Sequence, residues 1–240
     1  MGENQAETEQ SGIEQAGAER AGEGAESVAA EAGPQAAGTE REVGVGPWPG
    51  QWPDGDHFDP ELLAEGDRRN VLDHYRYWKH SAIMDDLDAK RHEFHVAIEN
   101  WQHDFNIGTV VRSANAFLAA EVHIIGKKRW NRRGAMVTDK YQHVRHHPTV
   151  VDFVAWARDA DLTVLGVDLF PDSVPLETYD LPRRCVLVFG QEGPGLSQAV
   201  QAEAADTLSI AQFGSTRSIN AGVAAGIAMH AWIRQHGHVG

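Results

Sequence analysis

Residues 186–196 read Val-Leu-Val-Phe-Gly-Gln-Glu-Gly-Pro-Gly-Leu, an apolar run that enters a glycine-rich turn. The same layout recurs at residues 210–227, where Ile-Ala-Gln-Phe-Gly-Ser-Thr-Arg-Ser-Ile-Asn precedes an Ala- and Gly-rich stretch. A third segment, Asn-Ile-Gly-Thr-Val-Val-Arg at 106–112, places polar residues at the start of a predicted helix. Ligands of α/β proteins bind at the carboxyl ends of parallel strands. The three segments therefore predict one site that is built from several loops.

The spacing of apolar residues predicts strands that alternate with helices. The predicted strands are residues 94–99, 122–126, 162–169, 186–190 and 207–211, and the predicted helices are 106–120, 151–160, 196–205 and 219–235. This alternation indicates an α/β fold with a mostly parallel sheet and helices on both faces. Residues 46–93 are predicted to form an N-terminal extension, helical over 67–91, in front of one domain at 94–240.

The first 45 residues are predicted to be a disordered acidic tail. Ten Glu and two Arg in residues 1–50 give a local charge of about −8, and residues 1–45 contain no aromatic side chain. Such a segment buries too little apolar surface to offset its chain entropy. It lacks the apolar core of a signal peptide. An acidic tail that competes for a basic surface is the functional alternative.

Two features of the whole chain indicate its compartment. No apolar run reaches the roughly 18 residues of a membrane span, so no membrane partner is expected. Cys185 is the single cysteine, so an internal disulfide is impossible and a reducing cytoplasm is the expected location. Because Cys185 lies at the start of an apolar strand, we expect it to pack in the core rather than act as a nucleophile.

The net charge of −14 argues against nucleic-acid binding, but local patches decide such binding. Residues 127–147, here called the basic segment, hold seven Lys or Arg, one Asp and three His, a local charge of about +6. Trp130 and Tyr141 lie among them, which favours base stacking and phosphate contact with RNA over a merely solvated loop. The candidate RNA-binding residues are Lys127, Lys128, Arg129, Arg132, Arg133, Lys140 and Arg145.

Several familiar sites are not indicated. The turn from Gly190 to Gly195 has the spacing GxxGxG, which differs from the GxGxxG of dinucleotide-binding folds. It lacks the Lys-Ser/Thr of a phosphate-binding P-loop, and the chain has no GxSxG elbow of a hydrolase. The histidines have no HExxH spacing, and the neighbours His146 and His147 are expected to point apart, so no metal site is predicted.

Each candidate site residue also has an ordinary structural explanation. Glu192 could stabilise the N-terminus of the next helix, and Thr216 or Ser218 could cap the last helix. Arg112 is the only charged residue of its predicted helix, and Gly108, one turn earlier, would leave room for a ligand to approach. The alternative for Arg112 is a side chain that simply extends to water.

The three segments together resemble the TrmH/SpoU branch of the SPOUT methyltransferases, which methylate ribose 2′-hydroxyls in RNA. The resemblance rests on Asn106-x-Gly-x-x-x-Arg112, Phe189-Gly-x-Glu192-Gly-x-Gly195-Leu and Ser218-x-Asn220, and it covers about residues 94–235. Gln191 departs from the pattern, because many relatives carry Ser or Asn there. The resemblance implies a C-terminal trefoil knot, an exception to unknotted topology, a homodimer, and S-adenosylmethionine as cofactor.

The resemblance also implies roles for single residues. Arg112 would clamp a phosphate and the reacting hydroxyl, because an arginine is essentially never deprotonated in proteins. Asn106 and Asn220 would orient Arg112 and the ribose. The implied catalytic residues are Asn106, Arg112, Glu192, Ser218 and Asn220. The implied cofactor-binding residues are Phe189, Gly190, Gln191, Glu192, Gly193, Ile210, Ala211, Gln212, Ser218, Ile219 and Asn220.

The expected function is therefore S-adenosylmethionine-dependent 2′-O-methylation of a ribose in structured tRNA or rRNA. A non-catalytic RNA-binding protein of the same fold is the main alternative. A nucleotide-binding oxidoreductase is a second one, which the glycine spacing disfavours. The last helix carries a stripe of small and flexible residues that suits either dimerisation or packing within the monomer. The stripe consists of Gly222, Ala225, Gly226 and Met229.

Overall fold

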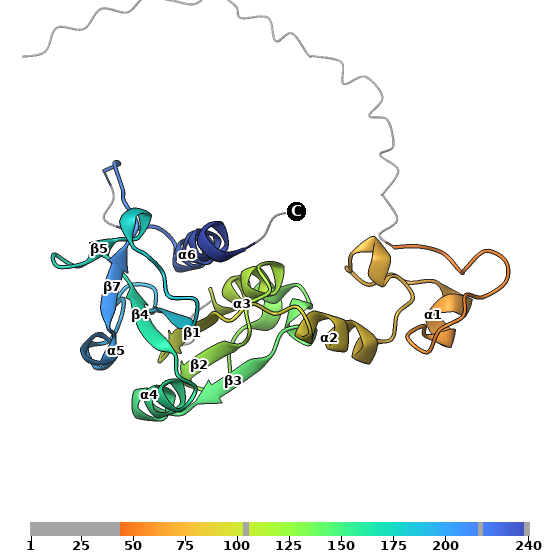
Figure 1. The fold of residues 1–240 in the computed structure, drawn as a ribbon, viewed down its shortest axis with the longest axis horizontal. Coiled ribbons are helices and arrows are strands. Elements are labelled where there is room, and N and C mark those ends of the chain that lie inside the picture. The colour runs from red at the N-terminus through yellow and green to blue at the C-terminus, as the bar shows by residue number, and fades with distance from the viewer. Residues whose placement is uncertain (1–43, 103–105, 216–217, 238–240) are drawn as a thin grey trace, which may run out of the picture. The chain divides into compact units, whose positions relative to one another are not determined.

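The computed structural model describes residues 44–102, 106–215 and 218–237. Its centre is a seven-stranded sheet in the order β3-β2-β1-β6-β4-β7-β5, in which every neighbouring pair is parallel (Figure 1). The strands are β1 (His95–Asn100), β2 (Val122–Gly126), β3 (Val144–His147), β4 (Thr163–Val167), β5 (Val174–Pro175), β6 (Cys185–Phe189) and β7 (Asp206–Ser209). The predicted parallel α/β architecture is confirmed.

Helices cover both faces of this sheet (Figure 1). One face carries α3 (Ile107–Ala116) and α6 (Ala221–His236), and the other carries α4 (Val150–Asp159) and α5 (Gln198–Glu203). β6 is buried at every position, which explains its unbroken apolar sequence. Burial raises the pKa of the Cys185 thiol to about 12, so this cysteine belongs to the core as expected.

The helix predicted over 106–120 ends early, at Ala116, because Leu118 adopts a left-handed backbone with a φ of 54°. The helix predicted over 67–91 is interrupted as well. The chain forms a short 3-10 turn at Asp73–Tyr75, becomes extended at Lys79, and only then enters α2 (His80–Asp88). Upstream, α1 (Pro60–Glu65) begins where the Asp59 carboxylate accepts a hydrogen bond from the Glu61 amide.

The N-terminal extension packs against the basic segment. Tyr75 and Ile83 form an apolar cluster with Tyr141 of that segment. Arg91 donates a hydrogen bond to the backbone oxygen of Tyr141 at 3.0 Å. Two further 3-10 turns, Arg132–Ala135 and Thr138–Lys140, shape the basic segment before β3. The N-terminal extension therefore lies directly beside the basic segment and supports it.

The described part of the chain has no helix of the length and apolar character that a membrane crossing requires. The predicted acidic tail falls almost wholly on residues 1–43, which lie outside the described residues.

Candidate active site

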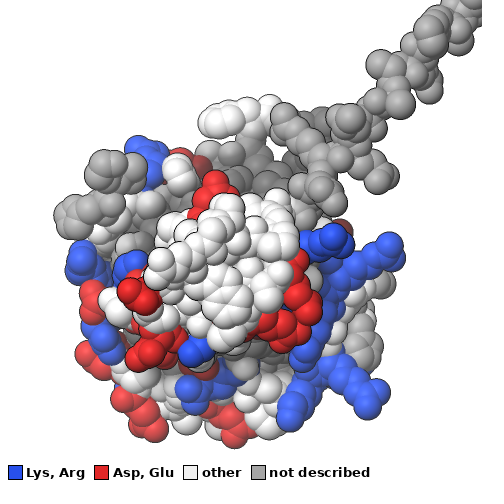
Figure 2. Space-filling view, turned by 90° about the vertical axis from the view of Figure 1, so that its right-hand side faces the viewer, with Lys and Arg blue, Asp and Glu red and all other residues white. Residues whose placement is uncertain are grey.

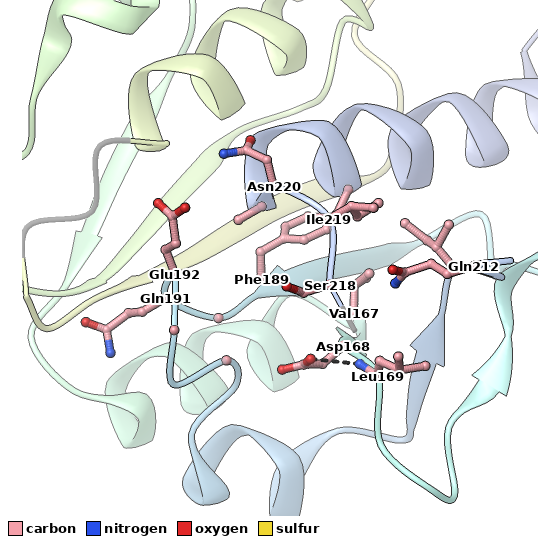
Figure 3. A pocket seen from close by; sticks show the side chains of 16 residues that line it. Val167, Asp168, Leu169, Phe189, Gln191, Glu192, Gln212, Ser218, Ile219 and Asn220 are labelled. Carbon is pink, nitrogen blue, oxygen red and sulfur yellow. Dashed lines mark hydrogen bonds between the residues drawn. The ribbon is translucent and has the colours of Figure 1, made fainter. Parts of the chain in front are cut away.

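A cavity of about 410 Å³ opens at the carboxyl edge of the sheet (Figure 3). It is built from the residues that follow β4, β6 and β7 and from the first turn of α6. Its position is the one that the sequence predicts for a ligand site in a parallel sheet. The cavity is lined by Val167, Asp168, Leu169, Phe189, Gly190, Gln191, Glu192, Gly193, Gly195, Ile210, Gln212, Ser218, Ile219, Asn220, Ala221 and Ala224.

The turn after β6 closes on itself. The Gln191 amide donates to the Gly195 oxygen at 3.2 Å, and the Gly195 amide donates back to the Gln191 oxygen at 3.0 Å. A Cβ on Gly190 would lie 2.0 Å from the carbonyl carbon of Gly195, so the closed turn has room only for glycine here. The Asp168 carboxylate accepts from the Leu196 amide at 2.8 Å and ties the turn to the end of β4.

Three of the implied catalytic residues meet across this edge, although they come from separate segments. The Asn106 amide donates to a carboxylate oxygen of Glu192 at 3.0 Å, and the Asn220 amide donates to the side-chain oxygen of Asn106 at 2.8 Å. Figure 3 shows the Glu192 and Asn220 side chains on the same side of the cavity, and Asn106, which is not drawn there, bonds to both. The segments at 106–112, 186–196 and 210–227 therefore contribute to one site.

The Asn220 side chain has a second role. Its oxygen accepts hydrogen bonds from the amides of Gly222 at 2.9 Å and Val223 at 3.3 Å, so Asn220 caps α6. Ser218, one alternative considered for this cap, does not fill it, and Thr216 lies outside the described residues. Ser218 instead lines the cavity.

The Gln191 side chain turns away from the cavity interior (Figure 3). Its side-chain oxygen accepts a hydrogen bond from the Trp101 amide at 2.9 Å. The departure from Ser or Asn at this position thus leaves the closed turn intact.

The cavity includes all but one of the predicted cofactor-binding residues; the exception is Ala211, whose amide donates to Glu177 at 3.0 Å. Sequence analysis missed the contribution of β4. Asp168 directly follows Val167, the last residue of β4. A carboxylate at the carboxyl end of a central strand is a feature that could have identified Asp168 as a site residue.

Arg112 is exposed on α3 and does not line the cavity. Among the described residues, its guanidinium makes no hydrogen bond or ion pair, and it is not part of the network of Asn106, Glu192 and Asn220. The structure therefore leaves this charge available to a ligand or to water.

The expected role of Gly108 is wrong. This residue is fully packed, and a Cβ there would lie 2.7 Å from the amide nitrogen of Ala135 and 2.8 Å from the Cα of Gly134. Gly108 thus lets the backbone of the basic segment approach α3, and it gives no ligand access to Arg112.

All seven candidate RNA-binding side chains are exposed, but one of them is separated from the rest. Arg145 pairs with Glu121 at 2.9 Å and lies 5.7 Å from the Trp156 ring, on the face that carries α4. Tyr141 is 8% exposed and is packed in the extension, so it has little ring surface left for base stacking. Trp130 is half-buried and carries the Arg132 guanidinium 5.6 Å from its ring.

A histidine ladder crosses strands β1, β2 and β3 on the face of the sheet that carries α4. His95 Nδ1 lies 3.1 Å from His123 Nε2, and His123 Nδ1 lies 2.9 Å from His147 Nε2. His146 instead reaches the backbone oxygen of Gly126, so His146 and His147 point apart as expected. Ligand atoms of His95, Glu121 and His123 lie within 4.8 Å of one another, a grouping that no local sequence spacing indicated.

The small-residue stripe on α6 belongs mainly to the core. Gly222, Ala225 and Met229 are buried, with Gly222 close to Thr109 of α3, whereas a Cβ on Gly226 would have no atom within 4 Å. Val223 and Ile227, 53% and 40% exposed, lie beside Gly226 on the outer face of the helix.

Comparison with known proteins shows the family of the chain. Residues 93–230 match the model of the SpoU rRNA Methylase family. The tRNA (guanosine(18)-2′-O)-methyltransferase of Escherichia coli K12 is 24% identical over 165 residues, which are 68% of this chain and 72% of that enzyme. An uncharacterized tRNA/rRNA methyltransferase of Mycobacterium avium is 33% identical over 147 residues, 58% of this chain and 47% of that protein.

A solved structure shares the fold. The AdoMet-bound rRNA methyltransferase from Sinorhizobium meliloti superposes with a TM-score of 0.55 at 26% identity, covering 62% of this chain and 60% of that one. The chain thus spans about half the length of the mycobacterial relative and three fifths of the Sinorhizobium protein. Because the family model covers more than half of its residues, the chain belongs to the SpoU rRNA methylase family.

Proposed function

We propose that this protein transfers the methyl group of S-adenosylmethionine to a ribose 2′-hydroxyl in structured tRNA or rRNA. The observation that carries the proposal is the meeting of Asn106, Glu192 and Asn220 beside a cavity at the carboxyl edge of the sheet. Family membership supports the same reaction. A non-catalytic RNA-binding protein of this fold remains the alternative, and cofactor binding distinguishes the two.

The cavity suits S-adenosylmethionine. Phe189, Ile210 and Ile219 offer apolar surface for the adenine ring, and the backbone around Gly193 allows close approach of the polar parts. When bound, the cofactor supplies an activated methyl group on its sulfonium, so the protein needs only to position the acceptor and handle its proton.

We assign the acceptor side to Asn106, Arg112 and Asn220. Asn106 is held by Glu192 on one side and by Asn220 on the other, so its orientation is fixed before RNA binds. Arg112, always charged and outside the cavity, would bind the phosphate beside the target ribose and stabilise negative charge on the hydroxyl oxygen. Ser218, on the cavity wall, would contact the substrate or the cofactor.

The direct test is transfer of labelled methyl from S-adenosylmethionine to separated tRNA and rRNA pools that lack this modification, followed by mapping of ribose methylation. One 2′-O-methylated position would establish reaction and substrate together. Cofactor binding without transfer to any RNA pool would contradict the tRNA or rRNA substrate, and absence of cofactor binding would favour the non-catalytic alternative.

Arg112→Ala should lower methyl transfer by about 10²–10³-fold, because it removes a positioned charge from the reacting oxygen. Since Arg112 does not line the cavity, the affinity for S-adenosylmethionine should stay within a few-fold of wild type in calorimetric titration. Arg158→Ala, which removes an exposed charge from α4, is the matched control. Loss of cofactor binding in Arg112→Ala would contradict the assignment to the substrate side.

We further propose that residues 94–240 form the methyltransferase domain, with residues 46–93 as an extension, and that the protein acts in the cytoplasm as a homodimer with a trefoil knot. The outer face of α6 supports the dimer, since Val223 and Ile227 expose apolar surface beside the open Gly226. The strand order supports the knot, because β6 lies between β1 and β4 while α6 returns to pack beside α3.

A further inference from the structure

A second cavity, of about 870 Å³, lies where the N-terminal extension packs on the basic segment. It shares no lining residue with the cavity at the carboxyl edge of the sheet. We call it the Arg68 cavity. It is lined by Arg68, Arg69, Asn70, His80, Met136, Val137, Thr138, Lys140 and Tyr141.

The walls of the Arg68 cavity are held in place by hydrogen bonds. His80 Nε2 lies 2.8 Å from the backbone oxygen of Lys140 and joins the extension to the basic segment. The Arg69 guanidinium donates to both carboxylate oxygens of the buried Asp67, at 2.9 and 2.7 Å, and to the Trp78 oxygen at 2.8 Å. Because Arg69 is committed to these partners, its role is to hold the extension in shape.

Two other cations at this cavity have no such partners. The side chains of Arg68 and Lys140 are exposed, and neither forms an ion pair or hydrogen bond within the described residues. Arg132, close by in the chain, pairs with Asp139 at 3.6 Å, and its side chain is 74% exposed. On the face of the molecule in Figure 2, Lys and Arg side chains gather most densely along the right-hand side. Unpaired positive charge beside a cavity suits an anionic ligand.

The tip of the basic segment places apolar side chains beside these charges. Met136 and Val137 are 55% and 57% exposed, and both adopt left-handed backbone conformations, with φ of 48° and 71°. Such a conformation is rare for a β-branched residue and costs about 1–3 kcal/mol. A chain that needed only a turn here would be better served by glycine, so the presence of Met136 and Val137 indicates that their side chains have a use.

We propose that the Arg68 cavity is a second RNA-binding subsite, in which Arg68 and Lys140 bind backbone phosphates while Met136 and Val137 contact the face of a base. The proposal rests on RNA being the substrate of the proposed function. A single-stranded or looped segment fits, because its phosphates and base faces are both accessible. The subsite would bind a part of the substrate RNA distant from the reacting ribose, and it would thereby contribute to the selection of the target nucleotide.

The test compares the full-length wild type with the Arg68→Gln/Lys140→Gln double variant in fluorescence anisotropy. The probes are a labelled unmodified tRNA transcript and a labelled single-stranded RNA of mixed sequence, titrated at several salt concentrations. We expect at least about tenfold weaker binding, and a salt slope smaller by about 1.4, from about 0.7 per lost phosphate contact. Arg158→Gln, which removes an exposed charge from α4, should bind within twofold of wild type.

Unchanged binding by the double variant, or equal weakening in Arg158→Gln, would overturn the proposal. Displacement of RNA by a polyglutamate peptide as effectively as by unlabelled RNA would also overturn it, in favour of an acidic protein ligand. Calorimetric titration with S-adenosylmethionine separates this result from the proposed function. If the wild type binds no cofactor, the proposed function fails, and the salt slope still decides the subsite.

Val137→Gly tests the apolar part separately. Glycine tolerates a φ of 71° without strain, so the melting temperature should hold or rise. RNA affinity should nevertheless fall several-fold if the side chain contacts a base. Unchanged affinity in this stable variant would remove Val137 from the subsite.

Discussion

The carboxyl edge of the sheet and its α4 face each hold three polar side chains linked by hydrogen bonds, but in different surroundings. At the carboxyl edge, Glu192 and Asn220 are exposed beside a cavity. On the α4 face, His123 is fully buried, with its ring centroid 3.9 Å from that of Trp156. A linked set of polar groups that opens to a cavity can exchange a partner for a ligand. One whose central member is sealed in the core, as His123 is here, satisfies its own atoms instead.

The charge state of the ladder follows from this burial. Burial, with nearby positive charge from Arg184 and Arg145, lowers the pKa of His95 to about 4, and burial lowers that of His147 to about 4 as well. The pKa of His123 is held well below its usual value by the same burial. Neutral imidazoles can each donate one N–H and accept another, so three of them form a continuous chain across β1, β2 and β3.

The carboxyl edge should be most sensitive at Gly190. In Gly190→Ala, the new methyl group would collide with the backbone of Gly195 and Leu196, at 2.0 and 2.2 Å, so the turn must open. We expect affinity for S-adenosylmethionine to fall by about 100-fold or more in calorimetric titration. Gly214→Ala is the control, because nothing lies within 4 Å of a Cβ there. Equal cofactor affinity in the two variants would mean that the turn does not form the cofactor site.

Two substitutions of Asn220 distinguish the effect of capping α6 from the effect of the hydrogen bond to Asn106. Asn220→Ala should lower stability by about 1 kcal/mol, the usual cost of a lost cap, and lower methyl transfer by about tenfold. Asn220→Asp keeps the capping oxygen but loses the donor to Asn106, so stability should be retained while methyl transfer falls. Thermal melts and initial rates on both variants measure the two effects. Full activity in Asn220→Asp would show that the contact with Asn106 is dispensable.

The histidine ladder on the α4 face should make the stability of the protein depend on acid. The histidine pKa is about 6.5 in the unfolded chain but about 4 for folded His95 and His147, so the unfolded state binds more protons between these values. Stability should therefore be complete above about pH 6.5 and decline as the pH falls toward 4. Melting temperatures measured from pH 7.5 to 4.5 check this. A melting temperature that is flat across this range would show that the ladder already carries protons in the folded state.

The sequence predicted those elements whose formation depends on a local pattern of apolar residues. The strand from Val186 onward and the helix after Asn220 carry strong apolar patterns, and both lie close to their predicted positions. That the three segments form one site was predictable from their places at the carboxyl ends of strands and at the start of a helix. The specific roles of Asn106, Glu192 and Asn220 were indicated only by the family resemblance, because residues so far apart in the chain carry no pairwise signal of their own.

Other features depend on tertiary context. β3 was missed because its sequence, Val-Arg-His-His, lacks apolar alternation and is stabilised by its place at the sheet edge. The histidine ladder joins residues 28 and 24 positions apart, so no local spacing reveals it. Gly108 was misread because a glycine needed for backbone packing has the same sequence signature as one needed for ligand access.

The packing of Gly108 against the basic segment has a mechanical consequence. The first turn of α3 carries Asn106 at its start, and on its side it is in direct contact with Gly134 and Ala135. If RNA binds to the basic segment, this helical turn becomes a rigid spacer between the bound RNA and the cavity where the methyl group is transferred. The target ribose would then be selected by its fixed distance from the RNA bound to the basic segment. A change in the packing of Gly108 on Gly134 and Ala135 would move the methylated position along the RNA.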